Sequence, residues 1–423
     1  MLTFKFPTAK FPGERVGKMT IVINETGLSA TRPRSRVTTV AALAGAALAF
    51  AWACMTGPGD DGHDATRLAI LDSQVEHVLG PTMEEFETAA IALKDATAAW
   101  SSAAVAGGDV VAARETAQTA WRDAMLVWQR AEMLQVGPAG SSAFVVGGQD
   151  QRDQIYSWPT VNGCRIDEET VAQSYDVADF FTSSLVNVRG LDALEYLLWA
   201  DPTMNACAAT EPLNQAGSWA ALEVEELERR RADYAAAAAA EVARLASELA
   251  LTWRPDAGEF AVWITAPGEA GSPYGDPTEA LDELFGAAGY ADTVLKDRKL
   301  AASSVTTTES PWSLESKAHV RANLDGLQQL IWGGKSASEG TGFDDLLIEL
   351  GEAELADELN LAIADAIAGV EAVEGSFEAA VTADPAALTA IQSAVQKIVD
   401  LLKGRVSIAL GLRSPGEAAG DAD

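Results

Sequence analysis

Long stretches in which apolar residues recur every three or four positions constrain the fold of this chain most. The clearest stretch is 218–253, which is rich in alanine and repeats its apolar side chains with the 3.6-residue period of an α-helix. Further helices are expected at about 65–101, 110–135, 167–188, 190–199, 314–332, 343–350, 355–381 and 385–410. Short connections between long amphipathic helices favour antiparallel bundles, so the predicted fold class is all-α.

The segment Gly190–Trp199 carries the most informative side chains. It is apolar apart from Asp192 and Glu195, which lie three residues apart and therefore share one face of a helix. Buried carboxylates are costly unless a cation or hydrogen bonds compensate them. The alternative is that Asp192 favours the positive N-terminal end of the helix dipole while Glu195 is exposed.

A third carboxylate, Glu132, follows the apolar stripe of the helix expected at 110–135. The stripe includes Trp128, so Glu132 is expected at the edge of the core. Packing of this helix on the segment 190–199 would bring Glu132 to Glu195, and two or three carboxylates with water suit a hard cation such as iron, calcium or magnesium. The alternative is an ion pair between Glu132 and an arginine, for example Arg130.

Several motifs in a fixed order resemble those of the imelysin-like proteins. They are Trp121-x6-Trp128-x3-Glu132, Tyr156-Ser-Trp158-Pro159, Gly190-x-Asp192-x-x-Glu195, Ser310-Pro-Trp312-Ser313 and Asn323-Leu-Asp-Gly326. The resemblance as a whole covers about residues 65 to 412. The family is one of bacterial cell-envelope proteins, once filed as metallopeptidases and more often linked to iron acquisition. Its motif is Gly-x-His-x-x-Glu, so Asp192 replaces a histidine and alters the family's inferred metal site.

The resemblance implies an architecture and a location for the site. It implies two packed four-helix-type bundles related by structural duplication, which we place at 65–212 and 213–412, with a flexible tail at 413–423. A groove between the bundles would be lined by side chains from both halves. The expected lining residues are Trp128, Trp158, Trp312, Ser313 and Asn323. The alternative for Trp312 is ordinary packing, and for Ser313 it is helix capping.

The N-terminal region has the pattern of an export signal. Three arginines between residues 32 and 36 precede the uncharged run Val37–Ala53, which predicts a signal peptide over 1–53. Cys54 directly follows Ala53, as at a bacterial lipoprotein processing site, so lipidation of Cys54 and a tether over 54–64 are expected. Ordinary cleavage after Ala53 and a retained anchor are alternatives, although a spanning helix needs about 20 residues. The expected location is the envelope, lipid-anchored, at the outer membrane facing the periplasm.

The net charge of the chain limits the class of molecule that it can bind. Residues 54–423 hold 23 basic and 60 acidic side chains, a formal net charge of −37, which argues against nucleic acid. An acidic surface raises the local cation concentration, but it also serves solubility.

If Cys54 is lipidated, Cys164 and Cys207 remain as a pair. In an exported protein such a pair predicts a disulfide, here one that encloses the segment 190–199.

Three functions follow from these observations. The leading hypothesis is a non-enzymatic envelope lipoprotein that binds iron, another cation or a metal complex, with Asp192, Glu195 and Glu132 as ligands. The second is a metallopeptidase, although the chain has no His-Glu-x-x-His pair. The third is an interaction scaffold that contacts another envelope protein and has a degenerate site. The protein would be attached to the membrane only through the lipid on Cys54.

Overall fold

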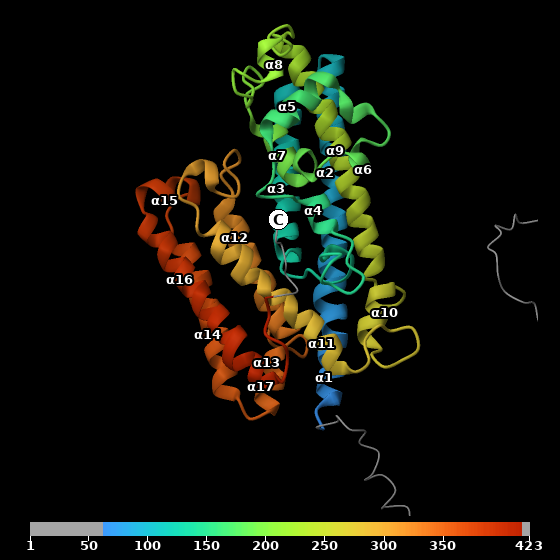
Figure 1. The fold of residues 1–423 in the computed structure, drawn as a ribbon, viewed down its shortest axis with the longest axis vertical. Coiled ribbons are helices and arrows are strands. Elements are labelled where there is room, and N and C mark those ends of the chain that lie inside the picture. The colour runs from blue at the N-terminus through green and yellow to red at the C-terminus, as the bar shows by residue number, and fades with distance from the viewer. Residues whose placement is uncertain (1–61, 417–423) are drawn as a thin grey trace, which may run out of the picture. The chain divides into compact units, whose positions relative to one another are not determined.

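The computed structural model describes residues 62–416, which form helices and loops without a strand (Figure 1). Predictions for the signal segment and for Cys54 fall on residues that are not described. The helices up to the middle of the chain are α1 (Asp64–Ser73), α2 (Gly80–Ala106), α3 (Val110–Ala131), α4 (Gln151–Ile155), α5 (Gly163–Ala172), α6 (Phe180–Ser183), α7 (Gly190–Trp199), α8 (Pro212–Gln215) and α9 (Val224–Thr252). The later ones are α10 (Glu259–Thr265), α11 (Pro277–Gly286), α12 (Ser316–Trp332), α13 (Phe343–Glu349), α14 (Ala353–Ala372), α15 (Phe377–Ala383), α16 (Pro385–Leu401) and α17 (Ser407–Leu410).

The first group of helices is built on α2, which packs along both α3 and α9. Helix α3 starts where the Asp109 carboxylate accepts a hydrogen bond from the Ala112 N–H at 3.0 Å. The motif helix α7 packs between α3 and α9. The sequence places the stretch 218–253 in the second bundle, whereas α9 packs with these earlier helices. The structural duplication therefore stays a prediction.

The second group consists of α12, α14 and α16, of which α14 contacts both others. Helix α12 also packs along α3 and so joins the two groups. A π-helical segment, η6 (Ala291–Lys299), packs on α12 and α16. The interface between α3, α12 and η6 is therefore where side chains from both halves of the sequence meet.

Two stretches that the sequence predicts as single helices are broken. The region 167–188 contains α5 and α6, because Gln173 adopts a left-handed conformation with φ of 54° and ends α5. The region 355–381 is divided after α14, and Gly375 has φ of 73° in the connection to α15. Periodicity identifies helical faces but misses a one-residue change of backbone direction.

The disulfide between Cys164 and Cys207 is present, which confirms that prediction. It ties the start of α5 to the segment before α8, and α7 lies within the loop that it closes. Within residues 62–416, no helix combines the length and the apolar character needed to cross a membrane.

Candidate functional site

The motif helix α7 begins at a glycine that its surroundings require. Gly190 has φ of 86°, and a Cβ atom there would lie 2.6 Å from the carbonyl oxygen of Ile155. A side chain at this position would therefore meet both backbone strain and a clash. Gly190 lets α7 start directly against α4, and this contact fixes where Asp192 and Glu195 point.

Asp192 lies in the first turn of α7 and is 2% exposed. Its Oδ2 accepts a hydrogen bond from the Ser157 hydroxyl at 2.7 Å, and its Oδ1 accepts one from the Ala193 N–H at 3.0 Å. Burial raises the pKa of Asp192 to about 6, although these hydrogen bonds act in the opposite direction. Asp192 thus connects α7 to the turn that contains Trp158.

Glu195 joins α7 to the second half of the chain. Its Oε1 accepts hydrogen bonds from the N–H groups of Trp312 and Ser313 at 3.2 and 2.7 Å, and from the Ser313 hydroxyl at 2.7 Å. Burial outweighs these bonds and raises the pKa of Glu195 to about 8. The protonated form therefore prevails at neutral pH. The predicted approach of Trp312 and Ser313 to the motif helix is present in the structure.

Glu132 lies at the C-terminal end of α3, wholly buried, between two cations. Its Oε1 lies 3.1 Å from Nε of Arg152, and its Oε2 lies 3.0 Å from Nζ of Lys299. The Tyr290 hydroxyl donates to the same Oε2 at 2.6 Å. The alternative of an ion pair with an arginine holds, but the partner is Arg152. Arg130 instead pairs with Glu85 at 2.6 Å.

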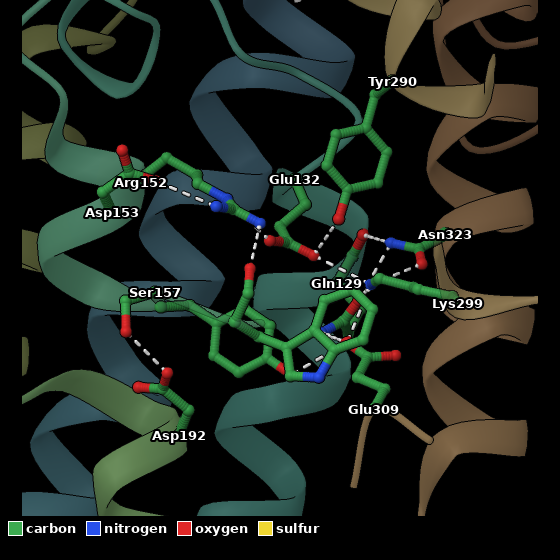
Figure 2. A network of polar contacts seen from close by, with 12 residues as sticks. Gln129, Glu132, Arg152, Asp153, Ser157, Asp192, Tyr290, Lys299, Glu309 and Asn323 are labelled. Atoms are coloured by element: carbon green, nitrogen blue, oxygen red, sulfur yellow. Dashed lines mark hydrogen bonds and ion pairs between the residues drawn. The ribbon is translucent and has the colours of Figure 1, made fainter. Parts of the chain in front are cut away.

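Lys299 is the centre of the network drawn in Figure 2. In addition to Glu132, its ammonium group contacts Oε1 of Glu309 at 2.8 Å and Oδ1 of Asn323 at 2.9 Å. The same oxygen of Glu309 accepts a hydrogen bond from the Tyr156 hydroxyl at 2.9 Å. Burial raises the pKa of Glu309, but the positive charge of Lys299 and the contacts with its neighbours outweigh this effect and lower it.

The three predicted metal ligands lie in one region but do not converge on one point. Among residues 62–416, the group of possible ligands whose donor atoms lie within 4.8 Å of one another is Cys164, Glu168 and Cys207, and its cysteines form the disulfide. Glu132 already has two cationic partners. As folded, this donor set does not fit a metal ion, and binding of one at Asp192, Glu195 and Glu132 stays a prediction.

The predicted pocket-lining residues occupy different environments. Trp128 and Asn323 are buried in the core, where the Trp128 ring lies 4.8 Å from that of Phe86. Trp158 lines a cavity of about 30 Å³ that also has Arg152 in its wall. A larger cavity of about 480 Å³ lies on another side of Arg152, under the loop 137–150.

Sequence reasoning missed Lys299, Arg152, Glu309 and Tyr290. Lys299 ends the run Lys296-Asp-Arg-Lys299, whose charges are typical of a solvated face, although Lys299 itself is 4% exposed. Glu309 directly precedes the Ser310-Pro-Trp motif, and that position is a signal that could have identified it. The motifs supply acidic residues, whereas the two cations that compensate Glu132 lie 20 and 167 positions away from it, outside those motifs.

Comparison with known proteins gives a family and a fold. The family model of imelysin, Peptidase M75, matches residues 76–404. A crystal structure of an iron-regulated protein A precursor from Parabacteroides distasonis is 16% identical, with a TM-score of 0.62 over 82% of this chain and 95% of that one. An imelysin-like protein from Psychrobacter arcticum is 17% identical, with a TM-score of 0.59 over 83% and 97%. No curated protein sequence matches.

Proposed function

Because this chain belongs to the imelysin family, we propose that it is a non-catalytic binding protein of the bacterial cell envelope that takes part in acquiring iron. The link to iron is supported by a structural relative that is named an iron-regulated protein. The envelope location is supported by the signal-like sequence before Cys54. Lipid anchoring at Cys54 and an outer-membrane position belong to the same proposal.

The observation that carries the non-catalytic assignment is the internal neutralisation of two buried carboxylates, Glu132 and Glu309. Lys299 lies within 3.0 Å of both Glu132 and Glu309, and Arg152 occupies the other oxygen of Glu132. A catalytic carboxylate must reach a substrate proton or hold a metal with an open position. Both oxygens of Glu132 and one oxygen of Glu309 are instead engaged by protein groups, so their arrangement suits a rigid framework and does not favour the metallopeptidase alternative.

Iron would then be bound as a complex with an organic ligand. A bare cation at Glu132 would have to displace Lys299 and Arg152, and that exchange would leave two buried cations without partners. A metal complex presents the chemical groups of its organic ligand, which a polar cavity can bind by hydrogen bonds and ion pairs. A protein partner in the envelope remains an outcome that the experiment can reveal.

Growth under iron limitation tests this proposal. A strain from which the coding sequence is deleted should grow more slowly when iron is chelated, and excess iron should restore its growth. Complementation by Glu195→Gln should succeed, because glutamine resembles the protonated carboxyl. Equal growth of the deletion and parent strains at every iron level would contradict the iron role. Failure of a well-folded Glu195→Gln variant would point to a ligand or catalytic role for Glu195.

A further inference from the structure

The central network does not account for the cavity of about 480 Å³ under the loop 137–150. Its wall includes Gln135, Ser142, Asp150, Arg152 and Arg189. The loop is held from the other side, where the N–H of Val146 donates to the Glu283 carboxylate at 2.9 Å. The cavity is large enough for a small organic molecule.

Arg189 is the charged group of this wall that lacks compensation. It is 8% exposed, and it forms no ion pair or side-chain hydrogen bond with any residue that the structure describes. Its Nε atom is buried without a partner. Burial lowers its pKa, and the nearby Glu241 acts in the opposite direction. Both oxygens of Glu241 are held by Arg244, at 2.7 and 2.8 Å, so Glu241 is already paired.

The other charges in the cavity wall have partners of their own. Arg152 pairs with Glu132 and with Asp153, at 3.1 and 2.8 Å. The Asp150 carboxylate accepts hydrogen bonds from the N–H and the hydroxyl of Ser142 at 2.8 and 2.5 Å. The wall therefore holds two arginines and two aspartates, and Arg189 is the one of these four whose charged group has no hydrogen-bond or ion-pair partner among residues 62–416.

A second unpaired donor lies in the same wall. Gln135 is 8% exposed, and its Nε2 amide is buried without a hydrogen-bond partner. Buried donors without partners are rare because each costs the desolvation energy of the group. Unlike other unpartnered buried donors, such as the indole groups of Trp100 and Trp128, these two belong to residues that line a cavity, where an acceptor that enters from outside can pair with them.

We propose that this cavity binds a small organic ligand through a carboxylate group that Arg189 receives, with the Gln135 amide as a further donor. The planar guanidinium presents parallel N–H groups that match the two oxygens of a carboxylate. Small carboxylic acids also chelate ferric ions, so the same cavity accounts for uptake of iron as a complex. Only the link to iron uptake rests on the proposed function. The assignment of a carboxylate site at Arg189 does not depend on that function.

Calorimetric titration of the purified full chain with citrate and with ferric citrate tests the proposal. Wild-type protein should bind citrate, and Arg189→Gln should weaken binding at least about tenfold, since a charge-assisted pair is lost. Arg189→Lys, which keeps the charge but loses the planar fork, should give an intermediate affinity. The matched control is Arg405→Gln, which removes the same charge from an exposed pair with Glu358 and should bind like wild type.

A second variant makes the test independent of the stability of Arg189→Gln. Ala143 is an exposed residue of the cavity wall, so Ala143→Trp should fill the cavity without disturbing the core and should also weaken citrate binding. Absence of citrate binding to wild type, or equal binding by Arg189→Gln and Arg405→Gln, would overturn the proposal. Growth under iron limitation is a separate measurement. If citrate does not bind the cavity, the proposed role in iron acquisition is therefore still tested by that growth experiment.

Discussion

Two neighbouring regions, the network around Lys299 and the cavity around Arg189, differ in whether their buried charges have partners. Lys299 lies within 3.0 Å of two carboxylates, and Arg152 within 3.1 Å of one of them. Arg189 has no such partner among residues 62–416. A paired buried charge contributes to architecture, whereas an unpaired one carries a cost that a ligand can remove. The contrast separates the part that holds the protein together from the part that we propose binds.

The largest expected effect comes from breaking the paired region. Lys299→Met leaves Glu132 and Glu309 buried without their shared cation and should lower the free energy of unfolding by about 3–5 kcal/mol. Urea denaturation measures this change. Lys403→Met, which breaks a surface pair with Asp292, is the control and should cost no more than about 1 kcal/mol. Equal losses of unfolding free energy in both variants would contradict a structural role for Lys299.

The disulfide tests stability without touching the cavity. Replacing both Cys164 and Cys207 by serine should lower the free energy of unfolding by about 2–4 kcal/mol, because a loop that includes α7 is no longer closed. Citrate affinity should stay within about twofold of wild type, since neither cysteine lines the cavity. A large loss of affinity would mean that the position of α7 controls the cavity as well as the network.

The raised pKa of Glu195 predicts a pH dependence. Its folded-state pKa of about 8 exceeds the ordinary value of 4.5, so its contribution to stability is complete below pH 4.5 and is lost as the pH rises through 8. Wild type should therefore lose stability relative to Glu195→Gln between pH 5 and pH 9, by on the order of 4 kcal/mol. Thermal unfolding across this range measures the difference. A constant difference would show that Glu195 titrates normally.

Removing the unpaired charge should affect stability least. Arg189→Gln should leave the free energy of unfolding within about 1 kcal/mol of wild type, or raise it, because a desolvated charge without a partner is lost. Urea denaturation without ligand is again the measurement. A loss as large as that of Lys299→Met would reveal a structural partner for Arg189 and remove the contrast between the two regions.

The sequence predicts the helical class because that follows from local patterns, as when the apolar period identifies α9. The approach of Ser313 to the groove is instead implied by the resemblance to the imelysin-like proteins, and in the structure Ser313 donates to Glu195. The sequence does not reveal the role of Lys299, because burial of a lysine depends on which helices pack over it. It also misses Arg189, whose lack of a partner can be established only after every nearby carboxylate has been placed.

The most direct test of the separation between the two regions is the rise in melting temperature that citrate causes in Lys299→Met and Arg189→Gln. A ligand that binds the folded state stabilises it in proportion to the logarithm of its concentration over the dissociation constant. We predict that Lys299→Met melts well below wild type but keeps the citrate-induced rise, whereas Arg189→Gln melts near wild type and loses it. A rise retained in Arg189→Gln and lost in a folded Lys299→Met would contradict the account.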